Sequence, residues 1–248
     1  MREINEKETK YVQEKLLILL KTAKEICEKE NIWYSLAYGS ILGAVRHNGF
    51  IPWDTDADIF IQLPDKQRFR EAFKKHKPDG IRLKNHDIER KCLQSHDTLV
   101  FEDKMMIDDI HLDIYPLVGA PDSPSEQRKF AKYIANWDKI IRSKYVDIHQ
   151  CKKKNRFFVF LVKCFDFFIP DKVLRKNIFN REHKYDFAKS NYLVSLSCYG
   201  KPNDCILKEV LLDVVPHLFC DETFNVPSNY DNYLRRTYGD DYMTPIKY

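Results

Sequence analysis

Hydrophobic residues recur every three or four positions in several stretches of the chain, and this spacing predicts amphipathic helices. The longest such stretch covers residues 5–30, where apolar side chains alternate in this period with lysines and glutamates. Further helices are expected in a stretch opened by Pro64 and over residues 125–148, 157–168, 172–188 and 229–239. Because most of these lie after residue 120, the second half of the chain is predicted to be mainly helical.

Other stretches have the β-branched and aromatic composition of strands. They cover residues 32–38, 56–62, 98–101 and 110–117. Side chains alternate between the two faces of a strand, so Asp56 and Asp58 are expected on one face and Asp113 on the same face as His111 and Tyr115. An acid within an apolar strand is costly without a partner, and Asp113 is therefore expected to have one.

No repeat, low-complexity tract or Gly/Ser linker divides the 248 residues. We therefore predict an α+β fold in one folded body. Residues 1–120 are expected to form a catalytic core with a mixed sheet flanked by helices. Residues 121–248 are expected to form a mainly helical region that packs on this core and completes the substrate site.

Composition excludes some classes of protein. An apolar fraction of 44% with 31% charged residues is typical of a globular domain rather than a disordered chain. The net charge of +4 gives no reason to expect nucleic acid as a partner, and the basic run 152–156 is better explained as a solvated helix start. Seven scattered cysteines without a Cys-x-x-Cys pair indicate a reducing compartment, so we predict a cytoplasmic protein. The charged N-terminus has no signal-peptide pattern.

One aromatic and basic segment leaves two interpretations open. Residues 152–169 combine Lys152, Lys153 and Lys154 with a run rich in phenylalanine, interrupted by Lys163 and Asp166. The run is too short to span a bilayer, which takes about 20 apolar residues. A core helix with a basic flank is one interpretation. The other is an interfacial helix that makes peripheral contact with the inner face of a membrane.

The residues that carry chemistry are concentrated between Tyr38 and Ile59. Gly39 and Ser40 lie where a strand ends and a short helix is expected to begin at Ser40, so backbone N–H groups and a hydroxyl are available to a phosphate. Arg46 and His47 follow on the same helix and could reach a phosphate or the acceptor. Asp54 is expected to cap the turn before the next strand and to play a supporting role.

Carboxylates dominate the rest of this region. Asp56, Asp58 and Asp113 would form a cradle of hard oxygen ligands suited to Mg²⁺ or Mn²⁺. An Asp-x-Asp pair or a Gly-Ser turn alone is usually a loop or a cap. The order strand, Gly-Ser, short helix, acidic pair and third acid is far more specific, and it predicts metal-dependent phosphoryl or nucleotidyl transfer.

The same residues resemble a known signature. The segments 38–54 and 56–59, the strand 111–117 and the C-terminal segments 224–227, 230–234 and 238–240 resemble the LicD family of phosphotransferases, which includes the fukutin-related proteins. That family is a branch of the nucleotidyltransferase fold of polymerase-β-like enzymes. The resemblance covers roughly residues 10–118 and 219–245. Two departures stand out, Phe219-Cys220 where the family has a Phe-Glu pair, and an extra residue in 238–243.

The resemblance implies transfer of a phospho-alcohol, such as phosphocholine or ribitol phosphate, from a cytidine diphosphate (CDP) donor to a sugar hydroxyl of a cell-surface glycan or glycolipid. It implies that Asp56, Asp58 and Asp113 are catalytic metal ligands and that Gly39 and Ser40 form the phosphate-binding turn. Two alternatives remain open. One is transfer of a nucleoside monophosphate to a small acceptor, and the other is a nucleotide-binding protein without turnover.

Overall fold

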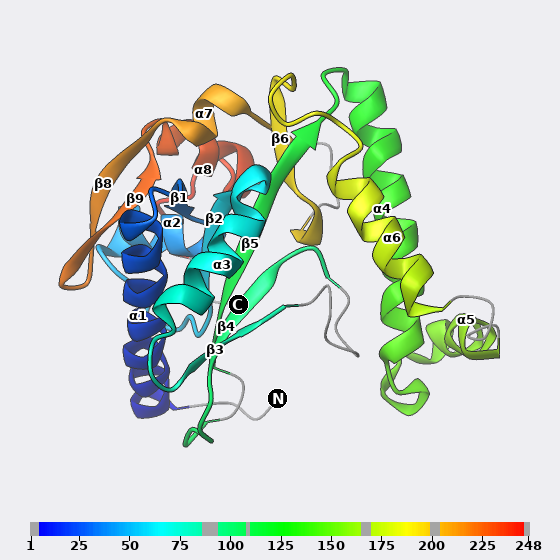
Figure 1. Ribbon diagram of the computed structural model, residues 1–248, viewed down its shortest axis with the longest axis horizontal. Coiled ribbons are helices and arrows are strands. Elements are labelled where there is room, and N and C mark those ends of the chain that lie inside the picture. The colour runs from blue at the N-terminus through cyan, green and yellow to red at the C-terminus, as the bar shows by residue number, and fades with distance from the viewer. Residues whose placement is uncertain (1–4, 86–93, 108–109, 165–169, 199–203, 246–248) are drawn as a thin grey trace.

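The computed structural model describes residues 5–85, 94–107, 110–164, 170–198 and 204–245 (Figure 1). A curled mixed sheet lies at the centre, and helices cover it. This arrangement confirms the predicted α+β class. Among the described residues, no helix is both long and apolar enough to cross a membrane.

In the described part of the chain the sheet has seven strands, with the order β1-β2-β5-β4-β3 along its main path. These strands are β1 (Tyr34–Leu36), β2 (Ala57–Gln62), β5 (His111–Ala120), β4 (Asp97–Phe101) and β3 (Ile81–Lys84). Strands β2 and β5 are parallel, and the other pairs are antiparallel. Because β5 is long, its first half pairs with β4 and its second half with β6 (Tyr192–Ser195), which in turn pairs with β7 (Ile206–Leu207).

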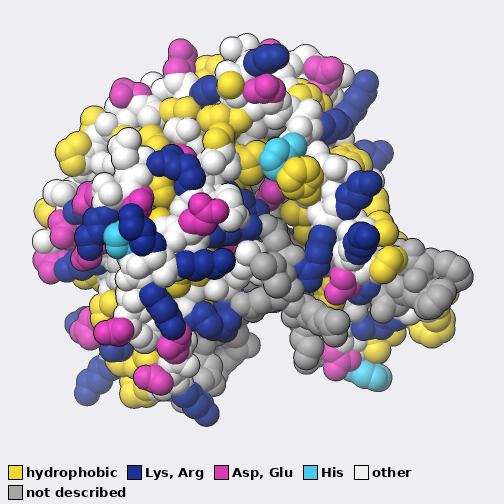
Figure 2. Space-filling view, in the orientation of Figure 1, with side chains coloured by type: hydrophobic (Ala, Val, Ile, Leu, Met, Phe, Trp, Pro, Cys, Tyr) yellow, Lys and Arg dark blue, Asp and Glu magenta, His cyan; other side chains and the backbone are white. Residues whose placement is uncertain are grey.

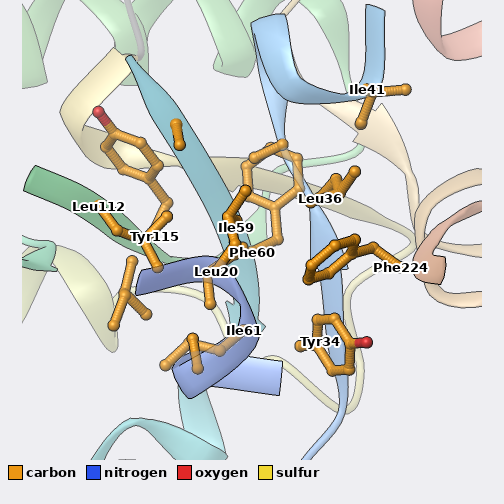
Figure 3. Packing of buried hydrophobic residues seen from close by; sticks show 14 of the residues in the cluster. Leu20, Tyr34, Leu36, Ile41, Ile59, Phe60, Ile61, Leu112, Tyr115 and Phe224 are labelled. Atoms are coloured by element: carbon orange, nitrogen blue, oxygen red, sulfur yellow. The ribbon is translucent and has the colours of Figure 1, made fainter. Parts of the chain in front are cut away.

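One main hydrophobic core joins the sheet to helix α1 (Glu6–Lys29). The helix begins with a capping box, in which Asn5 and Glu8 each accept a hydrogen bond from the other's backbone N–H. Its apolar stripe, which includes Leu16, Leu19 and Leu20, is fully buried. Figure 3 shows side chains of α1, β1, β2, β5 and β9 meeting in this cluster. Helix α3 (Lys66–His76) follows the short turn η1 (Leu63–Asp65) and packs against α1.

Three helices form a separate layer at the right of Figure 1. They are α4 (Pro124–Tyr145), α5 (Lys153–Cys164) and α6 (Asp171–Glu182), with the short turn η2 (Ile148–Gln150) between the first two. We call them the α4–α6 lobe. The helical segments predicted over 125–148 and 172–188 are present, although α6 ends six residues earlier than expected. The helix predicted over 157–168 corresponds to α5, and residues 165–168 lie outside the part of the chain that the structure describes.

The remaining C-terminal elements return to the sheet. They are η4 (Leu196–Cys198), α7 (Lys208–Leu212), the hairpin β8 (Val214–Phe219) with β9 (Glu222–Pro227), and α8 (Tyr230–Tyr238). Strand β9 packs beside β1, and α8 contacts α2 (Tyr38–His47). The sequence patterns predicted α8 but missed β6 to β9. Strands β6 and β7 are short, and β8 contains Pro216 and is largely exposed, so neither period nor composition marks these three.

Candidate functional site

Two predicted acids lie side by side at the centre of the sheet. Strands β2 and β5 pair in parallel with Asp58 opposite Asp113, so both side chains lie on the same face. Burial raises the pKa of Asp58 well above its ordinary value, and the neighbouring Asp113, Asp56 and Asp54 raise it further. Strand β2 begins at Ala57, so Asp56 lies just before it and is exposed. The structure therefore gathers four carboxylates, with Asp58 at their centre.

The Asp113 carboxylate has the partners that its position in an apolar strand requires. The Thr98 hydroxyl donates to its Oδ1 at 3.0 Å, and the Tyr115 hydroxyl donates to its Oδ2 at 3.0 Å. His96 Nε2 lies 3.6 Å and His111 Nε2 lies 3.9 Å from Oδ1. Thr98 lies on β4 and His96 just before it, and neither stood out in the sequence. They become visible as candidates only once the pairing of Thr98 with Asp113 is known.

The Gly-Ser turn is joined directly to the acidic strand. Ser40 is buried, and its Oγ accepts a hydrogen bond from the Asp58 backbone N–H at 3.0 Å. Helix α2 begins at Tyr38, two residues before the predicted start, and its N-cap is Ala37. The prediction that the serine begins the helix was therefore wrong. Ser40 instead links the first turn of α2 to β2, and its hydroxyl hydrogen is left to donate elsewhere.

Gly39 and Asp54 lie in close contact at the entrance to this turn. A Cβ atom on Gly39 would lie 3.1 Å from Asp54 Oδ2. Asp54 Oδ1 accepts from the backbone N–H groups of Thr55 and Asp56, which is the capping geometry expected for it. The Gln13 side chain donates to the Asp54 carbonyl oxygen at 2.9 Å and so ties this loop to α1. Burial, followed by the charge of Asp56, raises the pKa of Asp54.

Tyr38, at the junction of β1 and α2, has an unusual backbone conformation. Its φ of 44° lies in the left-handed region, where a bulky residue is strained. The ring packs edge-on against Phe60 at 5.0 Å and Tyr115 at 5.4 Å between centroids. These contacts hold a sharp strand-to-helix turn in place beneath the acids. Strain of this kind is common at functional sites.

Arg46 and His47 lie at the other end of α2. Arg46 Nε donates to His47 Nε2 at 3.0 Å, and its Nη1 donates to the Tyr242 carbonyl oxygen at 2.8 Å. Burial and the Arg46 charge lower the pKa of His47. Within the described part of the chain, none of their hydrogen bonds reaches Asp58 or Asp113. The structure thus joins this pair to the C-terminal segment rather than to the acids.

The acids of the C-terminal hairpin do not approach the site either. Asp221 and Glu222 form ion pairs of 3.0 Å with Lys21 and Lys24 of α1. The hydrogen bond from Lys21 lowers the pKa of Asp221. Cys220, which stands where the resemblance leads one to expect a glutamate, donates its backbone N–H to the Asn48 carbonyl oxygen at 2.7 Å. The hairpin turn is therefore bound to α1 and to the end of α2.

The charge of the acid cluster suits a cation. Of the described basic residues, no lysine or arginine forms an ion pair with Asp54, Asp56, Asp58 or Asp113. Mutual repulsion and burial both disfavour the ionised form of Asp58, and a bound cation would relieve both. Among the same residues, however, no three His, Cys, Asp or Glu side chains are arranged to hold a metal ion. The chain presents two adjacent carboxylates, Asp58 and Asp113, with Asp56 nearby.

A groove lies next to the acids on the side of the α4–α6 lobe. Its first part, a cavity of about 420 Å³, is lined by Ser95, Ser197, Tyr145, Arg142 and Arg181, among others. A second part of about 600 Å³ shares Arg142 and Ser197 and continues to α5. The Ser197 hydroxyl lies 2.7 Å from His96 Nδ1, and the other ring nitrogen of His96 faces Asp113. One imidazole ring thus separates the groove wall from the acid.

Arg181 is one of the residues that line the groove. The side chain is buried, and its Nη1 forms an ion pair with Asp138 at 2.8 Å. Its Nε has no hydrogen-bond partner among the described residues. A buried donor without a partner costs free energy, and this nitrogen is shielded from the groove itself. The groove therefore combines cationic groups, hydroxyls and the Tyr145 ring, a set that suits a polar ligand with several oxygens.

Comparison with known proteins identifies relatives of this chain. Residues 31–123 match the family model described as LicD/FKTN/FKRP, nucleotidyltransferase domain. The chain is 26% identical over 230 residues to the lipopolysaccharide cholinephosphotransferase LicD of Haemophilus influenzae, a match that covers 87% of this chain and 84% of that protein. The four clustered aspartates, Asp54, Asp56, Asp58 and Asp113, and the Gly39-Ser40 pair lie within the residues that match the family model.

Shorter matches occur to uncharacterised proteins of two Rickettsia species. The protein of Rickettsia typhi is 40% identical over 74 residues, which is 30% of this chain and 24% of that protein. The protein of Rickettsia prowazekii is 48% identical over 48 residues, which is 19% of this chain and 18% of that protein. Because both proteins are uncharacterised, these local matches say nothing about activity.

Proposed function

Because the chain belongs to the LicD family of phosphotransferases, we propose that it moves a phospho-alcohol from a CDP-linked donor to a sugar hydroxyl of a cell-surface glycan. The name of its Haemophilus influenzae relative, a lipopolysaccharide cholinephosphotransferase, supports a phosphocholine-type group and a glycolipid acceptor. The observation that carries the proposal is the pairing of Asp58 with Asp113 beside the Gly39-Ser40 turn.

In the proposed reaction the chain holds the donor pyrophosphate between the start of α2 and the acids. The first backbone N–H groups of α2 would face the phosphates, and Gly39 leaves room because it has no side chain. Asp58 and Asp113, with Asp56 beside them, would hold Mg²⁺ or Mn²⁺, which neutralises charge on phosphoryl oxygens when bound. Thr98 and Tyr115 would fix the orientation of the Asp113 carboxylate.

The bond changes follow from this arrangement. The oxygen of the sugar hydroxyl forms a bond to the phosphorus that carries the alcohol, and the bond from that phosphorus to the bridging oxygen breaks. Cytidine monophosphate (CMP) leaves with the bridging oxygen. A nearby carboxylate takes the hydroxyl proton, and Asp54 suits this role because its raised pKa makes it a better proton acceptor than an ordinary aspartate. Its contact with Gly39 puts it beside the phosphate-binding turn.

We assign the acceptor to the groove beside the α4–α6 lobe. Its wall lies one imidazole ring from Asp113, so a saccharide in the groove would reach the acids from the side opposite α2. Arg142 and the Ser197 hydroxyl supply donors for sugar oxygens. The Tyr145 ring offers an apolar face to a sugar ring. The donor and acceptor would thus occupy different parts of the chain.

A panel of CDP-alcohols tests the proposal. The purified protein is incubated with CDP-choline or CDP-ribitol, a lipopolysaccharide or teichoic acid acceptor, and Mg²⁺ or Mn²⁺. We expect release of CMP and labelling of the glycan, and no release with folded Asp58→Ala. Release of pyrophosphate from nucleoside triphosphates would instead indicate nucleotidyl transfer. Donor binding without turnover of any alcohol would indicate a nucleotide-binding protein.

A further inference from the structure

Helix α5 exposes large aromatic side chains to solvent. Phe157 is 72% exposed and Phe160 is 53% exposed, although both are among the largest apolar side chains. They lie three positions apart and therefore on one side of the helix. Single exposed apolar residues are ordinary, but adjacent phenylalanines on one helix face suggest a surface that something covers.

The other side of α5 accounts for the packing of the helix. Val159 and Val162 are buried against the lobe, and Phe158 lies under the Lys139 ammonium group at 4.1 Å from the ring centroid. Helices α4 and α5 make extensive contact. The helix is therefore held in place without any contribution from Phe157 and Phe160. The fold of the lobe therefore does not depend on these two side chains.

Basic residues surround the exposed rings. Helix α5 contains Lys153, Lys154, Arg156 and Lys163 and no acidic residue. Within the described part of the chain, none of these four side chains forms an ion pair with a carboxylate. The whole segment 124–182 contains fifteen basic and six acidic residues, a net charge of +9 against +4 for the entire chain. The rest of the chain is thus net negative, and the positive charge is concentrated on this lobe.

Three of the six acids in this segment are already engaged in ion pairs. Asp171 pairs with Lys144 at 2.9 Å, Asp138 pairs with Arg181, and Glu182 pairs with Lys66 of α3 at 2.8 Å. They therefore do little to neutralise α5. Figure 2 shows hydrophobic and basic side chains next to one another over the lobe. Arg156 and Lys163 donate only to backbone carbonyl oxygens in the described part of the chain, so their charge is not neutralised there. Aromatic rings among such cations are the surface that an anionic lipid membrane fits.

We propose that the outward face of α5, formed by Lys153, Arg156, Phe157, Phe160 and Lys163, docks on a membrane surface that contains anionic lipids. The phenylalanines would enter the boundary between headgroups and acyl chains, and the basic side chains would contact phosphate groups. The inward face of the same helix lines the second part of the groove through Asn155, Phe158 and Val159. Docking would therefore bring the groove close to lipid-linked molecules. This inference goes beyond the proposed function and does not depend on it.

Co-sedimentation with vesicles tests the docking. The full chain is mixed at physiological ionic strength with vesicles of phosphatidylcholine, either alone or containing phosphatidylglycerol. We expect binding only to the anionic vesicles, weakening as salt is raised. Phe157→Ser with Phe160→Ser should weaken partitioning about 100-fold, since each buried phenylalanine contributes about tenfold. Lys153→Ala with Lys163→Ala should weaken it about fivefold for each lysine.

Matched variants control for the loss of exposed residues in general. Ile18→Ser with Leu218→Ser removes apolar side chains of similar exposure from α1 and β8, and it should bind like the wild type. Circular dichroism should show the same fold for all variants. Absence of binding to anionic vesicles, or equal binding by the phenylalanine variant, overturns the proposal. A concentration-dependent dimer that the phenylalanine substitutions dissociate would assign the face to a second copy and overturn it as well.

Discussion

Helix α2 lies unusually close to the loop that leads to the acids, and Gly43 makes this possible. A Cβ atom at Gly43 would lie 2.4 Å from the Gly49 carbonyl oxygen and 3.3 Å from the Ile51 backbone nitrogen. Both obstacles are backbone atoms. The loop cannot easily yield, because the Ile51 carbonyl oxygen accepts from Gln13 Nε2 at 3.1 Å and from the Asp54 N–H at 2.9 Å. Gly43→Ala should therefore strain the packing of the helix against the loop.

The expected cost follows from two opposing terms. Forcing a methyl group into a packed contact costs about 1–3 kcal/mol, and the upper part of this range applies when backbone must move. Replacing glycine by alanine within a helix returns about 1 kcal/mol. The free energy of unfolding should therefore fall by about 1–2 kcal/mol, which lowers the melting temperature by about 2–8 °C for a chain of this size.

Urea unfolding followed by circular dichroism measures this change, with Gly39→Ala as the matched control. The nearest atom to a Cβ at Gly39 belongs to the Asp54 side chain, which can rotate away, so this variant should unfold within about 0.5 kcal/mol of the wild type. It should still impair transfer, because it displaces the Asp54 carboxylate. Equal stability of Gly43→Ala and the wild type would refute the reasoning.

Three further predictions follow from the site and its supports. The pKa of Asp58 is raised in the folded state, so ionising this carboxyl group lowers the free energy of unfolding as the pH rises above the ordinary aspartate range. Asp58→Asn should therefore be at least as stable as the wild type at pH 7, and Mg²⁺ should raise its melting temperature less than that of the wild type. Asp97→Asn disrupts a buried bidentate pair with Arg70 at 2.7 and 2.8 Å and should lower the free energy of unfolding by about 3–5 kcal/mol. Urea unfolding measures this change, and an unchanged midpoint of the unfolding curve would contradict the prediction. Arg142→Ala should raise the KM for the acceptor several-fold and leave the KM for the donor unchanged, with substitution of the exposed Arg128 by alanine as the control. If Arg142→Ala and the wild type have the same KM for the acceptor, the acceptor does not bind in the groove.

The parts of the site that the sequence revealed are those encoded over a few residues. Alternation in β2 and β5 predicted that Asp58 and Asp113 lie on corresponding faces, and the Gly-Ser step indicated a helix after β1, to within two residues of its start. Local periodicity also predicted α1, α4 and α8. Each of these inferences needs only the geometry of one element.

The features of the site and fold that the sequence did not predict depend on pairing between distant segments. His96 and Thr98 join the site because β4 pairs with β5, and no local pattern shows this register. The pairing of Arg46 with the Tyr242 carbonyl oxygen links residues almost two hundred positions apart. Strands β6 and β7 are short and gain stability from the edge of an existing sheet, so their own composition carries little signal.

The position of α5 connects the separate proposals. Its inward face belongs to the groove next to His96 and Asp113, and its outward face carries the exposed rings and the cations. A saccharide linked to a lipid is fixed near a membrane surface, so an enzyme that modifies it gains from docking its acceptor groove at that surface, where the local acceptor concentration is high. A free sugar acceptor would gain nothing. If vesicle binding lowers the acceptor KM for a lipid-linked glycan but not for its delipidated form, the two faces of α5 serve one reaction; if neither KM changes, docking and transfer are independent.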